Sequence, residues 1–171
     1  TDTHFFLPRE KLNRLAAAYT PGKNGAIQCV ERPTEKSRYV KLPHTYFMGS
    51  GGLVSTLHDY FRFDQMLLNG GELEGARILG RKTIDLMTQI HTGNLPIWLP
   101  GPWSGFGLGF GIVRDTSNVN TLTAGHPGPG PFSLGTFSWG RAFCTHPWVD
   151  PKEKLVAMVF TQVSPYTHLN I

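Results

Sequence analysis

GTFSWGRAFCTHPWVDPKEKLVAMVFTQ, residues Gly135–Gln162, carries the strongest strand signals in the chain. The pattern predicts two strands, Thr136–Cys144 and Leu155–Gln162, joined by a turn at Asp150 and Pro151. The second strand is a near-continuous apolar run, as expected for a strand buried on both faces. A glycine inside the first strand, Gly140, allows a ligand or another backbone to approach closely. We therefore expect a sheet with a binding partner at its edge.

The remaining sequence predicts helices that pack on this sheet, so the expected fold class is α+β. Thr56 and Asp59 have capping-box spacing at the start of a helix that ends at Asn69-Gly70-Gly71. Two further helices and three strands are expected: helices at Pro8–Tyr19 and Arg81–Ile90, an edge strand at Ile27–Val30, a glycine-spaced strand at Phe106–Val113 and a short strand at Val119–Thr123.

Composition limits the function classes. The chain has 171 residues, 40% of them hydrophobic, and a net charge of +4, which fits one folded domain. Its closest approach to a basic patch, Lys36–Lys41, holds only three positive residues, so no nucleic-acid partner is expected. Prolines and glycines interrupt the uncharged run Leu86–Val113, so no membrane span is expected there. We expect a soluble protein of the cytoplasm or periplasm.

The cysteines and histidines do not predict a metal site or a cofactor. No paired-cysteine or His-x-x-x-His spacing occurs, which is the pattern of zinc ligands. Cys29 and Cys144 either pair or stay reduced, and two cysteines are too few for a disulfide scaffold. Reduced thiols are the favoured interpretation.

Several motifs together resemble the superfamily of serine β-lactamases, penicillin-binding proteins and related esterases, in its class C-like branch. The first is Trp139-Gly140-x-Ala142 with its Trp-Val-Asp-Pro turn, which stands where the family carries its third active-site motif, Lys-Thr-Gly or Trp-Gly-Gly. Other blocks follow the family order: Gly51–Thr56, Asp59–Phe63, Met66–Gly71 and Gly105–Gly111.

The resemblance also shows what this chain does not contain. The family nucleophile is the serine of Ser-x-x-Lys, whose lysine takes the serine proton. No serine here is followed by lysine at that spacing, and no Tyr-x-Asn or Tyr-x-Ser motif occurs. In the family both motifs lie upstream of the blocks matched here. We therefore expect residues 1–171 to form a single partial domain, the C-terminal portion of a larger hydrolase, with the missing N-terminal portion as its partner.

By resemblance, the residues that remain form one wall of a substrate site. Trp139 and Gly140 would flank the acyl group, and the backbone N–H of Ala142 would donate to the oxyanion. The family has glycine at the positions of Arg141 and Cys144. The Arg141 side chain either binds a substrate carboxylate, crowds the strand edge or faces solvent.

Other candidate groups carry weaker signals. His126 and His146 are the nearest bases, but each is a lone loop histidine beside a proline. Ser55 and His58 share a helical turn without an acid to orient the imidazole. Trp98 and Trp103 either line the mouth of the site or cap the core.

Two functions are consistent with these observations. The first is a part of a serine hydrolase that acts by acyl-enzyme transfer on a small ester or amide. The missing lysine of the third motif favours an esterase over a β-lactamase, and the isolated chain is expected to be inactive. The alternative is a non-catalytic binding or structural protein that keeps the fold.

Overall fold

The computed structural model describes residues 2–23, 26–37, 39–40, 45–95, 97, 104–116, 132–140 and 142–164. Its main body is an antiparallel five-stranded sheet with the order β5-β6-β7-β8-β9. The strands are β5 (Ser104–Phe106), β6 (Gly111–Val113), β7 (Phe137–Ser138), β8 (His146–Asp150) and β9 (Leu155–Val159). Two small antiparallel hairpins accompany the sheet: β1 (Ala18–Pro21) with β2 (Ile27–Glu31), and β3 (Glu72–Leu73) with β4 (Ala76–Arg77).

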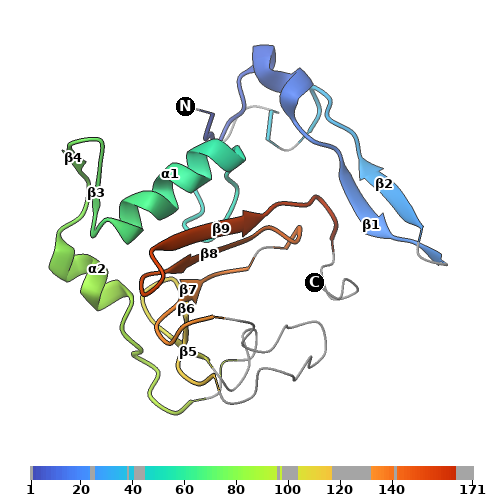
Figure 1. Cartoon of the computed structure of the whole chain (residues 1–171). Helices are drawn as coiled ribbons and strands as arrows, with labels where there is room; N and C mark the ends of the chain where they lie inside the picture. The colour runs from blue at the N-terminus through green and yellow to red at the C-terminus, as the bar shows by residue number, and fades with distance from the viewer. Residues whose placement is uncertain are drawn as a thin grey trace.

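The described residues also contain three helical elements: the 3-10 helix η1 (Arg9–Arg14), α1 (Leu57–Leu68) and α2 (Arg81–Met87). Figure 1 shows α1 lying along β9 and β8. Helix α2 lies beyond the C-terminal end of α1. The hairpin β1–β2 extends away from the main sheet. The expected α+β fold class is confirmed.

Helix α1 forms where the capping signal predicts it. The Thr56 side chain accepts a hydrogen bond from the Asp59 backbone N–H at 3.2 Å, which satisfies one of the free donors of the first turn. Asn69 is the C-cap, and Gly70 and Gly71 follow with positive φ angles of 72° and 97°. The predicted start and end of this helix are therefore correct.

The core lies between α1, α2 and one face of the sheet. Cross-strand partners in an antiparallel sheet share a face, and the register joins Ile112, Phe137, Val149 and Val156 in one row. Three of these side chains are buried against residues of the helices: Met66, Leu67 and Ile84. The next row, on the opposite face, contains Phe106, Gly111, Ser138, Trp148 and Ala157.

Two predictions for the stretch Gly135–Gln162 are wrong. It contains three strands, because β8 occupies residues that were expected to form a loop and turn, and the hydrogen-bonded part of β7 ends at Ser138. The expected burial of β9 on both faces is also wrong. Leu155 is 49% exposed and Val159 is 44% exposed, because β9 is the last strand of the sheet and α1 covers only one of its faces.

Three predicted elements have different lengths or forms. The N-terminal helix ends at Arg14, because Tyr19 joins a strand and donates its backbone N–H to the Gln162 carbonyl at 2.8 Å. The predicted single strand Phe106–Val113 is instead the end of β5, a turn at residues 107–110 and the strand β6. The second predicted helix, α2, ends at Met87, whose carbonyl accepts the Leu108 N–H at 2.9 Å. The edge strand β2 is confirmed and reaches Glu31.

Candidate functional site

The predicted site begins where the chain leaves β7. Trp139 and Gly140 directly follow Ser138, and Ser138 stands opposite Trp148 in β8. The Trp139 ring meets the Phe106 ring edge-to-face, with centroids 4.7 Å apart and planes at 77°. Such an aromatic pair contributes about 0.5–1.5 kcal/mol beyond its buried area. The end of β5 therefore holds the indole of the predicted motif in place.

Gly140 lies against the first residue of β8. A Cβ built on Gly140 would lie 3.6 Å from His146 Nδ1, an ordinary van der Waals distance, and Gly140 does not have a positive φ. Among the residues that the structure describes, neither packing nor backbone conformation therefore requires glycine at position 140. The sequence-based prediction for this glycine, that a ligand approaches the backbone closely, stays a prediction.

His146 is a strand residue, which corrects its interpretation as a loop histidine. It stands opposite Val159, and its ring centroid lies 5.9 Å from that of Trp148. Phe132 also contacts this tryptophan, with ring centroids 5.6 Å apart and planes at 68°. His146 therefore belongs to a row of aromatic contacts with Trp148 and Phe132.

Ala142 lies outside the strand in which it was expected. Ala142 and Phe143 form a turn, and the Ala142 side chain is exposed. The Thr161 hydroxyl donates to the Phe143 carbonyl at 2.8 Å, and the Thr161 N–H donates to the Cys144 carbonyl at 3.3 Å. These bonds fix the turn to the end of β9, and sequence reasoning did not identify Thr161.

Cys144 keeps a backbone conformation that suits glycine. Its φ is 56°, in the left-handed region that residues with a Cβ rarely adopt. Burial raises the pKa of the thiol, and the Thr161 hydrogen bond opposes this only in part. Since the thiolate is the nucleophilic form, a raised pKa makes Cys144 a poor nucleophile.

Asp150 anchors the turn after β8. It is 3% exposed, and it accepts hydrogen bonds from the backbone N–H groups of Ser133 at 3.1 Å, Lys152 at 3.0 Å and Glu153 at 3.1 Å. Burial raises the pKa of this carboxyl, but the hydrogen bonds outweigh burial, and the pKa is lowered overall. The predicted Asp-Pro turn is confirmed, and its role is structural.

Of the other sequence candidates, the structure describes Ser55, which lies elsewhere. The Ser55 hydroxyl pairs with the Thr3 hydroxyl at 2.8 Å, near the start of α1. Arg141, Trp98, Trp103, His126 and the strand expected at Val119–Thr123 lie outside the described residues. Both cysteines are free, Cys29 exposed and Cys144 half-buried.

The described part of the chain shows neither metal ligands nor a spanning helix. Within it, no three His, Cys, Asp or Glu side chains gather closely enough to bind a metal ion. None of its helices has the length and apolar character that crossing a membrane requires.

Comparison with known proteins gives a family match over almost the whole chain. The Beta-lactamase family model matches residues 1–169. Protein Rv1367c of Mycobacterium tuberculosis is 30% identical over 175 residues, which cover 96% of this chain and 40% of that protein. The chain therefore spans less than half the length of this curated relative.

Solved structures share the fold at low sequence identity. EstCE1, a hydrolase with promiscuous acyltransferase activity, has a TM-score of 0.75 at 22% identity over 96% of this chain and 42% of its own. A LovD6 mutant of simvastatin synthase from Aspergillus terreus has a TM-score of 0.68, with the same identity and coverage. A penicillin-binding protein homologue from Caulobacter crescentus has a TM-score of 0.61 at 17% identity, over 95% of this chain and 43% of its own.

Proposed function

The chain belongs to the Beta-lactamase family, and we propose that it forms one wall of the active site of a serine hydrolase acting by acyl-enzyme transfer on an ester or amide. The observation that carries this proposal is Gly140. Its φ is not positive, so its backbone conformation is open to other residues, and the described residues around it leave room for a methyl group. It also directly follows Trp139, whose ring packs against Phe106. A glycine that the fold does not need is explained by a substrate that approaches the backbone.

The wall would bind the acyl group and stabilise charge. Trp139 and Gly140 would flank the acyl group, and the Ala142 N–H would donate to the oxyanion. One such donor contributes about 2.7–4 kcal/mol to the lowering of the barrier. Arg141 would stand beside them, where it either binds a substrate carboxylate or faces solvent. No lysine stands in the Trp139–Arg141 triplet to meet the carboxylate of a β-lactam, which favours an ester substrate.

The nucleophile would come from outside these residues. We propose that residues 1–171 are the C-terminal portion of the catalytic domain and that a Ser-x-x-Lys segment lies in an N-terminal portion. The partial coverage of the relatives supports this proposal. No cofactor is needed, because serine acyl transfer uses only side chains and backbone donors.

The first experiment asks whether the isolated chain is active. We expect no hydrolysis of p-nitrophenyl acetate or butyrate above the rate in buffer, and no labelling by a fluorophosphonate probe, because no serine has its activating lysine. Hydrolysis together with covalent labelling of one serine would contradict the proposal that the nucleophile lies elsewhere.

The second experiment tests the wall in a chain extended upstream to its Ser-x-x-Lys segment. Gly140→Ala should lower kcat/KM by at least about tenfold while leaving the thermal midpoint within about 2 °C, since the methyl group fits. Gly49→Ala is the control, because a Cβ there meets nothing within 4 Å. An unchanged kcat/KM in Gly140→Ala would show that Gly140 is not part of the substrate site.

A second function is favoured by the position of Ala142. The expected oxyanion donor is exposed in a turn and is not a residue of β7. A binding or structural protein that keeps the sheet but has lost acyl transfer would tolerate Ala142 in a turn outside the strand. The native upstream sequence separates the two functions: an intact Ser-x-x-Lys favours the hydrolase, and a degenerate one favours the non-catalytic protein.

A further inference from the structure

An apolar surface joins the N-terminal segment to the loop that precedes α1. Three phenylalanine rings meet there: Phe47 packs edge-to-face against Phe5 and Phe6, with ring centroids 5.3 and 5.0 Å apart. A Cβ built on Gly52 would lie 3.6 Å from the Phe5 ring, so the end of the loop reaches the same place. The N-terminal apolar surface is the name used below for this set: Phe5, Phe6, Tyr46, Phe47, Met48 and Leu53.

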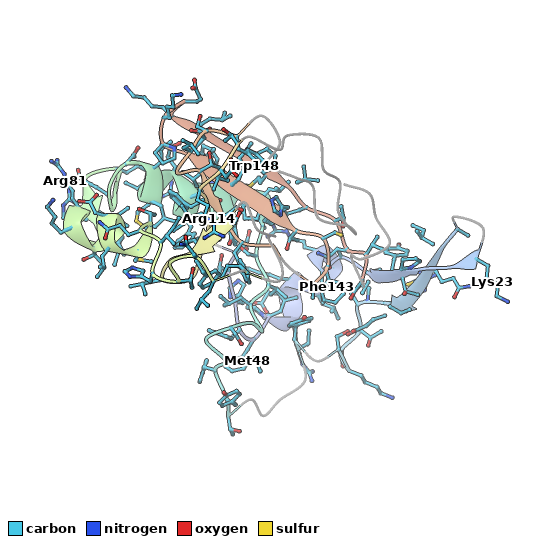
Figure 2. All side chains as sticks on the ribbon, turned by 90° about the horizontal axis from the view of Figure 1, so that it is seen from below. Lys23, Met48, Arg81, Arg114, Phe143 and Trp148 are labelled. Carbon is cyan, nitrogen blue, oxygen red and sulfur yellow. The ribbon has the colours of Figure 1, made fainter. Side chains whose placement is uncertain are left out.

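Much of this surface is open to solvent. Tyr46 is 74% exposed and Phe47 is 61% exposed, and Figure 2 shows Met48 on the rim of the molecule, away from Trp148. Residues 45–57 contain no Asp, Glu, Lys or Arg. Contiguous exposed apolar patches mark interaction sites, and aromatic residues and methionine are enriched in the cores of such sites while charged residues are depleted. Composition and exposure together indicate a docking surface.

We propose that the N-terminal apolar surface is covered by the N-terminal portion of the same catalytic domain. This inference rests on the proposed function for the existence of that portion, but not for its chemistry. The chain covers 40% of the length of Protein Rv1367c and 42% of EstCE1, so more than half of each relative lies outside the matched region. A further portion of that size is large enough to cover the surface.

The attachment of the N-terminal segment brings the entry point of that portion to the surface. The Asp59 carboxylate, in the first turn of α1, accepts the Asp2 backbone N–H, and His4 and Val54 exchange backbone hydrogen bonds. Three peptide steps lead from Asp2 to Phe5, which is at most about 11 Å of chain. Polypeptide that arrives at Asp2 therefore folds back onto the surface through a short loop, and short loops lose little entropy on closure.

The chemistry of the surface determines what the covering segment presents. Rings and a thioether bind aliphatic and aromatic side chains, whereas a charge buried against them would have no partner among the six residues. A membrane is the alternative occupant, and it would favour basic residues around the patch. Lys11 and Arg14, which could serve that purpose, instead bind the Asp2 carboxylate.

Thiol accessibility in the chain extended upstream tests the proposal. We expect maleimide to modify the thiol introduced by Tyr46→Cys at least about tenfold more slowly than that of Ile78→Cys in the folded protein, and at the same rate in urea. Ile78 is the control, because it is 68% exposed and donates its N–H to Gly71, beyond the C-terminal end of α1. Peptide masses separate these thiols from Cys29 and Cys144. Equal rates in the folded protein overturn the proposal.

A charge at the same position gives an independent measurement. Tyr46→Asp should lower the thermal midpoint of the extended chain by roughly 5 °C or more, because docking would bury an unpaired carboxylate. Ile78→Asp should shift it by less than about 2 °C, as expected for an exposed position. If Tyr46→Asp alone fails to fold, that result supports docking. Equal shifts in the two variants overturn it.

The outcomes separate this inference from the proposed function. An extended chain that has a degenerate Ser-x-x-Lys and no esterase activity, but still protects the Tyr46→Cys thiol, contradicts the function and keeps the docking surface. An active extended chain in which this thiol reacts freely overturns the docking surface alone. Binding of the extended chain to phosphatidylglycerol vesicles that is lost in Tyr46→Asp would assign the surface to a membrane and would also overturn the proposal.

Discussion

Cys144 shows how a single residue can keep the conformation of the residue that it replaces. The family resemblance places glycine here, and the backbone still has a left-handed φ of 56°. An L-residue with a Cβ loses roughly 1–2 kcal/mol in this conformation. The hydrogen bonds of Thr161 to the Phe143 and Cys144 carbonyls hold the turn despite that strain.

Cys144→Gly should therefore stabilise the fold by about 0.5–1 kcal/mol, since relief of the left-handed strain exceeds the added flexibility of the unfolded chain. Urea unfolding measures the change in the free energy of unfolding. Cys144→Ala is the control, because it removes the thiol and keeps the Cβ. Equal stabilisation by both substitutions would show that the thiol, and not the backbone, is the unfavourable feature.

At the scale of elements, the hairpin β5–β6 shows why the glycine-rich segment was predicted as one strand. Its alternating pattern is continuous, but Gly107 donates its N–H to the Phe110 carbonyl at 2.8 Å and reverses the chain. The turn fits because Gly109 adopts a φ of 96° and Gly107 lies directly against the end of α2. The alternating pattern of the sequence does not predict the contact between Gly107 and the end of α2.

Gly107→Ala should destabilise the protein by about 1–3 kcal/mol, because overpacking a tight contact forces the backbone to move. A Cβ on Gly107 would lie 2.2 Å from the Met87 carbonyl oxygen and 2.8 Å from Ile112 Cδ1. Thermal and urea unfolding measure the loss. Gly49→Ala is the control and should change stability by less than about 0.5 kcal/mol, because a Cβ there has nothing within 4 Å. A similar loss of stability in both variants would show that the tight contact at Gly107 is not the cause.

At the scale of the whole molecule, the N-terminal segment is attached to α1 by polar contacts. The Asp59 carboxylate accepts the Asp2 backbone N–H at 2.5 Å and the Thr3 hydroxyl at 3.0 Å, while His4 and Val54 exchange backbone hydrogen bonds. Lys11 and Arg14 bind the Asp2 carboxylate at 2.6 and 2.7 Å and lower its pKa to about 2.

Acid should release this segment before the sheet unfolds. The Asp2 backbone hydrogen bond is the main cause that lowers the pKa of Asp59. A lowered folded pKa means that the stabilisation is complete above the unfolded value of about 3.9 and is lost as the pH falls through the folded pKa. Hydrogen exchange at the His4 amide should therefore lose protection below about pH 4.

Asp59→Asn should lower the protection of the His4 amide at pH 7 and reduce its further loss in acid. Asp85→Asn is the control, because Asp85 forms an exposed ion pair with Lys82 within α2, at 3.4 Å, away from the N-terminal segment. Unchanged His4 protection in Asp59→Asn would show that the backbone bridge to Val54 holds the segment without the carboxylate.

The sequence alone was sufficient for features that depend on near neighbours. The cap at Thr56, the glycine end of α1, the Asp-Pro turn and strand β2 follow from local hydrogen bonds and backbone preferences, which a short window contains. The family motifs around Trp139 and Gly140 also identified the fold class correctly.

Only the tertiary structure decided which distant segments meet. It placed Phe106 against Trp139 and Thr161 on the turn at Cys144, and it left Leu155 and Val159 exposed at the end of the sheet. These outcomes depend on strand order and on what covers each face. Residues far apart in the chain determine both, so no local pattern of hydrophobicity can express them.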